Sequence, residues 1–299
     1  MGESIVKVEK LSHRYSVQWA VRDINFEITK NGIYGLLGSN GAGKSTIMNI
    51  MCGKVYIQGV DLAENPVDAK RHIGFLPQKP PLNMDLTVEE YLNFTANLRW
   101  IPAAEVSRAV KAVMGRCDIT HFRKRLIRNL SGGYQQRIGI AQAIIHNPKF
   151  VVLDEPTNGL DPNQIVEIRH LIQEIAEERT VILSTHILSE VQATCDYIRM
   201  IEQGKLVFAG TVNEFDNYIV PNTLFVSLAA APPVGELAAI PGVSRVEELG
   251  GSDYRVHFTD KRDVTNRIVQ ASVARDWELT EIRLEKSSLD TIFAELSKK

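Results

Sequence analysis

The hydrophobic pattern of the first third of the chain predicts strands interrupted by one helix. Apolar and polar residues alternate over 4–10 and 21–29, which is the period of half-buried strands. Residues 33–37 form an apolar run ending at a glycine, which predicts a buried strand feeding a loop. Residues 44–51 then have the period of a helix. Two further short strands are predicted, at 55–58 and 73–76.

The middle of the chain changes character over about 82–147, where helical periodicity replaces strand signals. Helices are predicted at 88–98, 103–114 and 134–146. After this helical insertion, strands and helices alternate, which indicates a largely parallel sheet covered on both faces. The predicted strands are 150–153 and 181–184, and the predicted helices are 162–178 and 188–194.

Pro221 and Asn222 mark a predicted boundary between domains 1–220 and 221–299. Beyond them the pattern predicts a βαββαβ order of ferredoxin-like type. The elements are 224–228, 234–240, 243–248, 254–258, 263–274 and 278–283, followed by a last helix at 289–296.

The connection near Gly53 is unusually short. A glycine is favoured just past a helix end, yet residues 54–57 already have a strand pattern. Helix-to-strand connections usually take about 2–6 residues. Either the helix ends earlier than 51, or residues are missing from the sequence at this point.

Composition and charge narrow the class of protein. The chain has 299 residues, a formal net charge of -2 and a pI of about 6.4. This balance lacks the basic face that nucleic-acid binding needs, so we expect no nucleic-acid partner. A basic run at 123–128 is either a solvated face or a contact with lipid headgroups or a partner.

The cysteines and the apolar runs favour a cytoplasmic protein. Cys52, Cys117 and Cys195 are odd in number and widely spaced, which gives no disulfide framework or zinc spacing. No targeting stretch begins the sequence, and no run approaches the ~20 apolar residues of a membrane-spanning helix. The chain alone is therefore not expected to form a transmembrane path.

The first motif with a chemical role is a Gly-rich loop between a predicted strand and a predicted helix. Residues 38–45, Gly-Ser-Asn-Gly-Ala-Gly-Lys-Ser, fit the phosphate-loop pattern. Glycines let the backbone amides wrap a phosphate, and the helix N-terminus adds a positive dipole end. Lys44 would reach the β- and γ-phosphates, and the Ser45 hydroxyl would bind Mg²⁺.

The strand predicted at 150–153 delivers two acids at its end. Asp154 would hold Mg²⁺, and Glu155 would orient or deprotonate the attacking water. Beside a phosphate loop this pair indicates nucleotide hydrolysis.

A second Ser-Gly-Gly loop at a helix N-terminus, residues 130–137, suggests how two chains cooperate. One nucleotide does not need two anion-binding helix starts from the same chain. In a symmetric dimer, the first loop of one subunit and the second loop of the other can clamp one γ-phosphate.

With these motifs, residues 4 to about 215 resemble the ATP-binding cassette (ABC) family. Residues 38–46 resemble its Walker A motif, 150–155 its Walker B motif and 130–137 its signature motif. Tyr134 replaces a usual glutamine, and Ser39 stands where proline is most common. The resemblance implies an α/β P-loop NTPase core with a helical insertion, to which the C-terminal pattern adds a small α+β domain. The nucleotide-binding residues implied are Tyr15, Gly38, Asn40, Gly41, Gly43, Lys44, Ser45 and Thr46.

The resemblance also implies roles outside those motifs. Gln78 is similar to the Q-loop glutamine, which contacts Mg²⁺ or the attacking water and couples the helical insertion to a membrane partner; the alternative is an exposed loop residue. His186 is similar to the switch histidine that hydrogen-bonds the γ-phosphate, where a structural histidine is the alternative. The implied metal ligands are Ser45, Gln78 and Asp154, and the signature residues reaching the partner's ATP are Ser131, Gly132, Gly133 and Gln135.

For two further residues a purely structural role is the alternative to the implied functional role. Asp161 resembles a D-loop residue at a dimer interface, but it could equally cap the helix that Pro162 opens. Tyr15 resembles the aromatic residue that stacks on adenine, and core packing is its rival.

The function implied is that of an ATP-hydrolysing motor subunit, forming a homodimer around two Mg-ATP and driving export through a separate transmembrane permease. It would lie at the cytoplasmic face of the membrane. The layout is similar to short exporter subunits for drugs, lipids, polysaccharides or gliding motility, and residues 288–293 fit their closing helix. The alternative is a soluble ABC ATPase acting on ribosomes or nucleic acid. The transported substance is selected by the partner and is not readable from this chain.

Overall fold

The computed structural model describes residues 4–16, 18–49, 54–218, 222–259, 261–285 and 295–296. The end of the helix predicted at 44–51, the short connection at Gly53 and most of the helix predicted at 289–296 lie outside these ranges. The chain divides into two compact units, Met1–Val212 and Asn213–Lys299.

The first unit contains a four-stranded antiparallel sheet in the order β2-β1-β4-β5. Its long strands pair with Val6 opposite Ile28, and Val6 also faces Ile57 on the other side. These three side chains are buried and belong to one core cluster, because alternate positions of each strand face inward. The strands are β1 (Val6–Tyr15), β2 (Gln18–Ile28), β4 (Lys54–Ile57) and β5 (Val60–Asp61).

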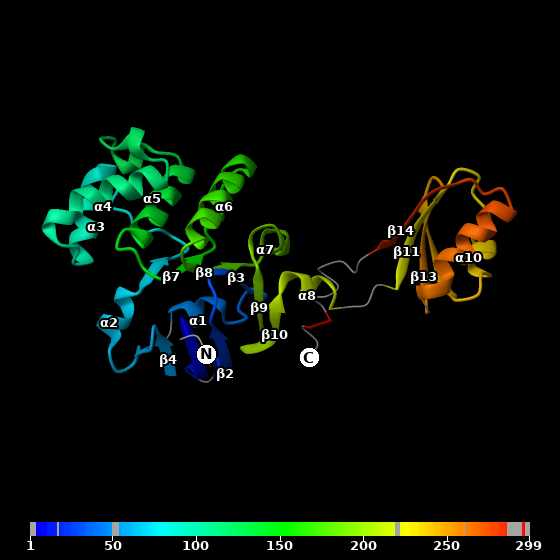
Figure 1. Ribbon diagram of the computed structural model, residues 1–299, viewed down its shortest axis with the longest axis horizontal. Helices are drawn as coiled ribbons and strands as arrows, with labels where there is room; N and C mark the ends of the chain where they lie inside the picture. The colour runs from blue at the N-terminus through cyan, green and yellow to red at the C-terminus, as the bar shows by residue number, and fades with distance from the viewer. Residues whose placement is uncertain are drawn as a thin grey trace. The chain divides into compact units, whose positions relative to one another are not determined.

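A six-stranded sheet in the order β10-β9-β3-β8-β7-β6 forms the centre of the first unit (Figure 1). The strands from β9 to β6 are parallel, and β10 alone runs antiparallel. Every residue of β7 and β8 is buried, as expected for parallel strands covered on both faces. The strands are β3 (Gly32–Leu37), β6 (Ile73–Leu76), β7 (Phe150–Asp154), β8 (Thr180–Thr185), β9 (Tyr197–Glu202) and β10 (Lys205–Thr211).

The predicted helical insertion is present as a group of helices beside this sheet (Figure 1). Its first helix starts at a capping box, in which the Thr87 hydroxyl accepts from the Glu90 amide and the Glu90 carboxylate accepts from the Thr87 amide. The insertion comprises α3 (Val88–Leu98), α4 (Ala103–Arg116), α5 (Gly132–Ile144) and the 3₁₀ turns η1 (Thr120–Phe122) and η2 (Ile127–Asn129). The remaining helices are α1 (Lys44–Asn49), α2 (Pro66–Arg71), α6 (Pro162–Ala176), α7 (Leu188–Thr194) and α8 (Val212–Asp216).

The second unit has a four-stranded antiparallel sheet in the order β12-β13-β11-β14. Its elements follow the predicted βαββαβ order, and the strand order is that of a ferredoxin-like sheet. Leu224, Val226, Val256 and Ile268 are among the side chains of its own hydrophobic core. The elements are β11 (Thr223–Leu228), α9 (Val234–Ala238), β12 (Val243–Gly250), β13 (Asp253–Phe258), α10 (Lys261–Ala274) and β14 (Leu279–Glu285).

Candidate active site

Several of the polar residues predicted from the sequence lie at one edge of the parallel sheet. Leu37, the last residue of β3, is in register with Thr185 at the end of β8, and Ser184 is in register with Asp154 at the end of β7. The loops that follow these three strands therefore leave the sheet side by side. Open α/β sheets bind ligands at this carboxyl edge.

The phosphate loop, residues 38–43, has a backbone that only small residues allow. Gly43 has a φ of +109°, and a β-carbon there would lie 2.6 Å from the carbonyl oxygen of Ala20. A β-carbon on Gly38 would lie 2.2 Å from the carbonyl oxygen of Ile201. At Gly41, whose φ is +83°, a β-carbon would meet nothing within 4 Å, so space remains beside that turn.

Ser39, which departs from the family's usual proline, is held by a side chain on β9. Its hydroxyl donates to the Glu202 carboxylate at 2.9 Å, and its amide lies 3.4 Å from the other carboxylate oxygen. A proline could make neither contact, because it has no hydroxyl and no amide hydrogen. The departure therefore fits this loop rather than disrupting it.

Lys44 lies buried beneath the loop at the start of α1. Its ammonium donates to the carbonyl oxygens of Gly38 at 2.8 Å and Ser39 at 3.0 Å. Burial lowers the pKa of this ammonium, and the nearby carboxylates of Glu155 and Asp154 oppose that shift. A buried cation held by neutral carbonyls suits an anionic ligand such as a phosphate. Ser45 is exposed and Thr46 half-buried in the first turn of the same helix.

Three polar side chains converge on the carboxylate of Glu155. The Gln78 amide donates to it at 2.8 Å, the Asn158 amide donates at 3.1 Å, and His186 Nδ1 lies 3.0 Å away. Glu155 itself has a φ of +46°, an uncommon backbone conformation for a non-glycine residue, and its side chain is only 15 % exposed. The structure thus brings together three residues that the sequence presents far apart, Gln78, Glu155 and His186.

A layer of polar contacts behind the site was not predicted from the sequence. The buried Asp154 carboxylate accepts from the Ser184 hydroxyl. The buried Glu190 carboxylate accepts from Thr157 at 2.7 Å and from Thr185 at 2.8 Å, which ties the loop after β7 to the loop after β8. Glu190 was not predicted because it belongs to no sequence motif, although it lies only five residues after Thr185.

The second Ser-Gly-Gly loop lies on the helical insertion, at the start of α5. Ser131 and Gly132 are exposed, and the Ser131 side chain makes no capping hydrogen bond. The Gln135 amide donates to the Leu130 carbonyl at 3.0 Å and so holds the loop from within. A β-carbon on Gly133 would meet the Gln164 side chain at 2.7 Å, whereas one on Gly132 would meet nothing within 4 Å.

The structure shows the surroundings of Asp161 and Tyr15, the two residues for which a purely structural role was the alternative. The Asp161 carboxylate accepts from the Gln164 amide at 3.0 Å, so it does cap α6. Tyr15 is 57 % exposed at the end of β1, with its ring edge-on to His13 at 4.6 Å between centroids. Core packing therefore does not explain Tyr15, and its ring face is accessible.

The oxygen donors proposed for Mg²⁺ do not form a preassembled metal site. Among the described residues no group of three or more His, Cys, Asp or Glu side chains could hold a metal ion. A hydroxyl, a carboxylate and an amide oxygen, from Ser45, Asp154 and Gln78, are the donors that Mg²⁺ takes alongside phosphates and water. This donor set fits Mg²⁺ arriving with a nucleotide.

The family model described as "ABC transporter" matches residues 21–158. Bacitracin transport ATP-binding protein BcrA of Bacillus licheniformis is 36% identical over 213 residues, which is 68% of this chain and 69% of that protein. Lantibiotic transport ATP-binding protein SrtF of Streptococcus pyogenes is 32% identical over 68% of this chain and 89% of its own. Linearmycin resistance ATP-binding protein LnrL of Bacillus subtilis is 26% identical over 98% of both chains.

Solved structures resemble about 70% of this chain. The cbiO1 subunit of Clostridium perfringens, part of the transporter complex cbiONQ, superposes with a TM-score of 0.65 and 30% identity over 71% of this chain and 90% of its own. The ATP-binding cassette MJ0796, solved as a dimer bound to ADP and Pi, gives a TM-score of 0.62 at 24% identity, over 69% of this chain and 98% of its own. The latter likeness concerns the fold alone. No described helix is long and apolar enough to cross a membrane.

Proposed function

This chain belongs to the ABC transporter family as an ATP-binding motor subunit, and from that membership we propose the residues, the assembly and the direction of transport. Its enzymatic activity is ATP hydrolysis. The observation that carries the residue assignments is the convergence of Gln78, Asn158 and His186 on Glu155, at the sheet edge where Lys44 lies buried.

Glu155 acts as the general base for hydrolysis. Three side chains fix the direction of its carboxylate, which is the requirement for taking a proton from a positioned water. Lys44 and the amides of the phosphate loop bind and orient the β- and γ-phosphates, and His186 reaches the γ-phosphate from the loop after β8. Tyr15 stacks on the adenine base.

Ser45, Asp154 and Gln78 would hold Mg²⁺ together with the nucleotide, and the ion would supply positive charge to neutralise the phosphates. The Gln78 amide nitrogen is committed to Glu155, which leaves its amide oxygen for this role. The Ser184 hydroxyl holds one oxygen of Asp154 in place.

Two copies of the chain close around two ATP molecules, with Ser131, Gly132, Gly133 and Gln135 of each reaching the nucleotide held by the other. The exposed Ser131 hydroxyl and the open space beside Gly132 support this arrangement, because neither is needed by the chain's own packing. Asp161 lies exposed at the start of α6 and can cap its helix while facing the second copy.

The motor drives export through a separate transmembrane permease, at the cytoplasmic face of the membrane. Relatives named for bacitracin, lantibiotic and linearmycin support export over the alternative of a soluble ATPase acting on ribosomes or nucleic acid. LnrL matches this chain over nearly its whole length, so the C-terminal unit is shared with at least one of them.

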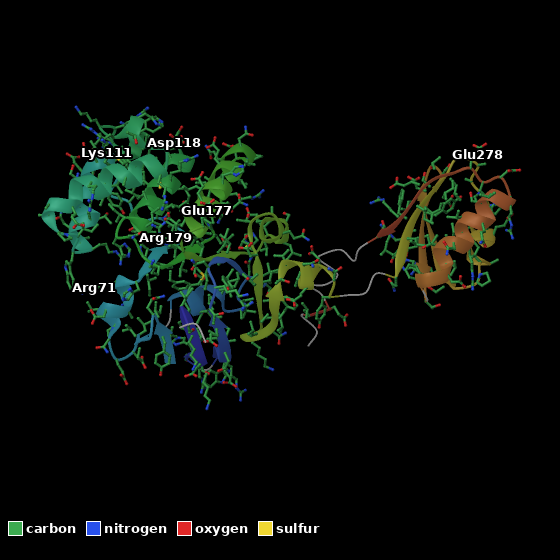
Figure 2. All side chains as sticks on the ribbon, viewed as in Figure 1. Arg71, Lys111, Asp118, Glu177, Arg179 and Glu278 are labelled. Atoms are coloured by element: carbon green, nitrogen blue, oxygen red, sulfur yellow. The ribbon has the colours of Figure 1, made fainter. Side chains whose placement is uncertain are left out.

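Substitution of Glu155 by glutamine tests the catalytic assignment. A glutamine keeps the size and the hydrogen-bonding reach of the side chain but removes its basicity, so ATP hydrolysis should fall by about 10²–10⁴-fold while ATP binding is kept. Steady-state hydrolysis and ATP affinity are the two measurements. The exposed Glu177 in the turn after α6 (Figure 2) provides the matched control, because Glu177→Gln should hydrolyse ATP like the unaltered chain. Unchanged hydrolysis in Glu155→Gln would refute the general-base role.

A further inference from the structure

The hairpin of β9 and β10 contacts the phosphate loop, residues 38–43, near both of its ends. β9 pairs with β3, the strand that leads into this loop (Figure 1). The carbonyl oxygen of Ile201, in β9, lies so close to Gly38 that a β-carbon on that glycine would be only 2.2 Å from it. After the turn of the hairpin, the Gly204 amide donates to the Ala42 carbonyl at 3.0 Å. The hairpin therefore supports the loop from the side of the sheet.

The turn of this hairpin is itself fixed against β2. Gln203 has a φ of +47° and Gly204 a φ of +75°, which are the successive positive angles of a tight hairpin turn. A β-carbon on Gly204 would lie 2.8 Å from the Ala20 carbonyl oxygen. The Gly204 carbonyl accepts from the Arg22 amide at 2.8 Å. A turn held in this way can position whatever its neighbouring side chains bind.

Glu202, the last residue of β9, makes a charged contact with the same loop. One of its carboxylate oxygens accepts from the Ser39 hydroxyl at 2.9 Å, and the other lies 3.4 Å from the Ser39 amide nitrogen. Hydrogen bonds to an ionised acceptor are stronger than those between neutral groups. Both the side chain and the main chain of Ser39 are thus directed toward one carboxylate.

Ser39 lies between this carboxylate and the cation that is expected to bind phosphate. Its carbonyl oxygen accepts from the Lys44 ammonium at 3.0 Å. Burial lowers the pKa of Lys44, and Glu202 is one of three carboxylates that oppose this shift. The first turn of the phosphate loop is therefore held by Lys44 on one side and by Glu202 on the other.

ATP binding changes only one of these two contacts. When the Lys44 ammonium turns toward a phosphate, the carbonyls of Gly38 and Ser39 lose their donor. The contact with Glu202 uses the hydroxyl and the amide of Ser39 and can persist in the bound state. Ordering a loop costs conformational entropy, so a contact that keeps the loop ordered before and during binding favours the ligand.

The serine at position 39 explains why this chain needs such a contact. Proline, which is most common at this position in the family, fixes its own φ near −65° through its ring and needs no partner for that. Serine has no such restriction. In this chain the contact with Glu202 can supply the order that the ring would otherwise supply.

Repulsion between Glu202 and the phosphates of ATP acts in the opposite direction. Glu202 is only partly buried, so water and salt screen its charge over the distance to the ligand. Its hydrogen bonds to Ser39 are short and direct. We therefore expect the loss of these hydrogen bonds to outweigh the relief of repulsion.

We propose that Glu202 is a positioning residue for ATP, which acts through Ser39 to keep the phosphate loop in its binding conformation. Glu202 contacts the loop and takes no part in the chemical step, so its removal should change the affinity for ATP and not the rate of hydrolysis. This proposal rests on the ATP-binding role of the loop given above.

Steady-state ATP hydrolysis by the isolated chain tests the proposal. Glu202→Ala should raise the KM for ATP by about tenfold, which corresponds to about 1.4 kcal/mol. The kcat should change by less than about twofold, because the residues around the attacking water are untouched. Glu27→Ala is the matched control, since Glu27 is an exposed acid on β2 in register with Lys7, and it should keep both constants. Melting curves without nucleotide verify that the variants fold.

Two substitutions of Ser39 test the route of the effect. Ser39→Ala removes the hydroxyl but keeps the amide, so the KM should rise by about threefold. Ser39→Pro removes both donors and fixes φ by its ring. In the Ser39→Pro background, Glu202→Ala should change the KM by less than about twofold. Repulsion of phosphates by Glu202 would act in both backgrounds, so this comparison isolates the contact with Ser39.

Three results would overturn the proposal. One is a KM that neither Glu202→Ala nor Ser39→Ala changes. Another is an equal rise of the KM on Glu202→Ala in the Ser39 and the Ser39→Pro backgrounds, because Glu202 would then act without Ser39. The third is a fall in kcat as large as the rise in KM, which indicates a general structural role. Absence of hydrolysis in the unaltered chain would instead refute the motor function.

Discussion

At the scale of single residues, the candidate site consists of a few side chains that the carboxyl edge of the sheet holds in place. Asp154 ends β7 and is in register with Ser184 of β8, two residues before His186, and Gln78 follows the end of β6. Glu155 receives its contacts from all of these loops. Because its backbone has a φ of +46°, its carboxylate leaves the strand direction and turns toward Gln78 and His186.

Tyr15 gives a prediction about nucleotide affinity. Stacking between an aromatic ring and a base contributes about 1–3 kcal/mol, so Tyr15→Ala should weaken ATP binding by about five- to 150-fold. Tyr15→Trp should retain the affinity, and hydrolysis at saturating ATP should change little in either variant. The melting temperature should also stay constant, since the ring is 57 % exposed. Trp19→Ala, at a neighbouring exposed ring, is the control. Equal affinities for Tyr15→Ala and the unaltered chain would exclude stacking.

The sequence predicted most of the site residues but not their connections. Lys44, Asp154 and Glu155 stand in motifs whose spacing reflects their chemistry. Glu190 stands in none, because its contacts with Thr157 and Thr185 depend on how two loops approach after folding. Capping of α6 by Asp161 was likewise open until the Gln164 contact was seen, and its role at a dimer interface stays a prediction.

At the scale of helices and strands, most segments with a clear apolar pattern were predicted to within a few residues, and some short elements were missed. The helix Val88–Leu98 and the strand Ile73–Leu76 have the predicted bounds. The helix Pro66–Arg71 was missed because its six residues contain one buried side chain, Ala69, and hence no apolar period. The hairpin of β9 and β10 was also missed, although Gly204 with a φ of +75° marks its turn.

His146, which follows α5, gives a prediction about pH. Its pKa is lowered from 6.5 to about 4 by burial, so the unfolded chain binds a proton at a higher pH than the folded chain. Stability is therefore full above about pH 6.5 and falls as the pH drops toward 4. From pH 7.5 to 5.0 the loss due to this residue should be about 2 kcal/mol.

Urea denaturation at these two pH values measures that loss. His146→Gln removes the titrating group, so its free energy of unfolding should fall less than that of the unaltered chain between pH 7.5 and 5.0. His170→Gln, on α6, serves as the control. An identical fall for His146→Gln and the unaltered chain would contradict the assignment.

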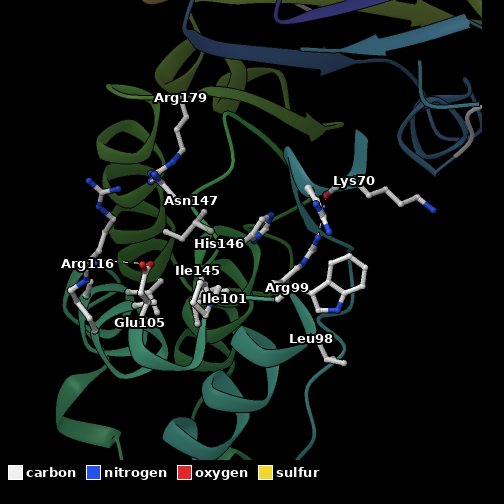
Figure 3. Close-up of a pocket in the computed structure, with 18 of the residues that line it drawn as sticks. Lys70, Leu98, Arg99, Ile101, Glu105, Arg116, Ile145, His146, Asn147 and Arg179 are labelled. Carbon is white, nitrogen blue, oxygen red and sulfur yellow. Dashed lines mark hydrogen bonds and ion pairs between the residues drawn. The ribbon is translucent and has the colours of Figure 1, made fainter. Parts of the chain in front are cut away.

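At the scale of the whole molecule, the two units differ in their sheets. The first buries a parallel sheet whose carboxyl edge carries the candidate active site and whose amino edge borders a cavity lined by six arginine and lysine side chains (Figure 3). The second has its own antiparallel sheet and its own core. The βαββαβ order could be predicted in part because β11 and β13 alternate cleanly between buried and partly exposed positions. The cavity could not, since its arginines lie far apart in the sequence and none belongs to a motif.

In the proposed dimer, one triphosphate lies between the Lys44 loop of one copy and the Ser131 loop of another. A crystal structure of Glu155→Gln with Mg-ATP tests it most directly, because the variant should bind ATP without hydrolysing it. We predict that the Ser131 hydroxyl of each copy lies within about 3 Å of a γ-phosphate oxygen held by Lys44 of the other. A nucleotide-bound structure in which Ser131 is remote from every γ-phosphate, in its own chain and in all neighbours, would contradict the claim.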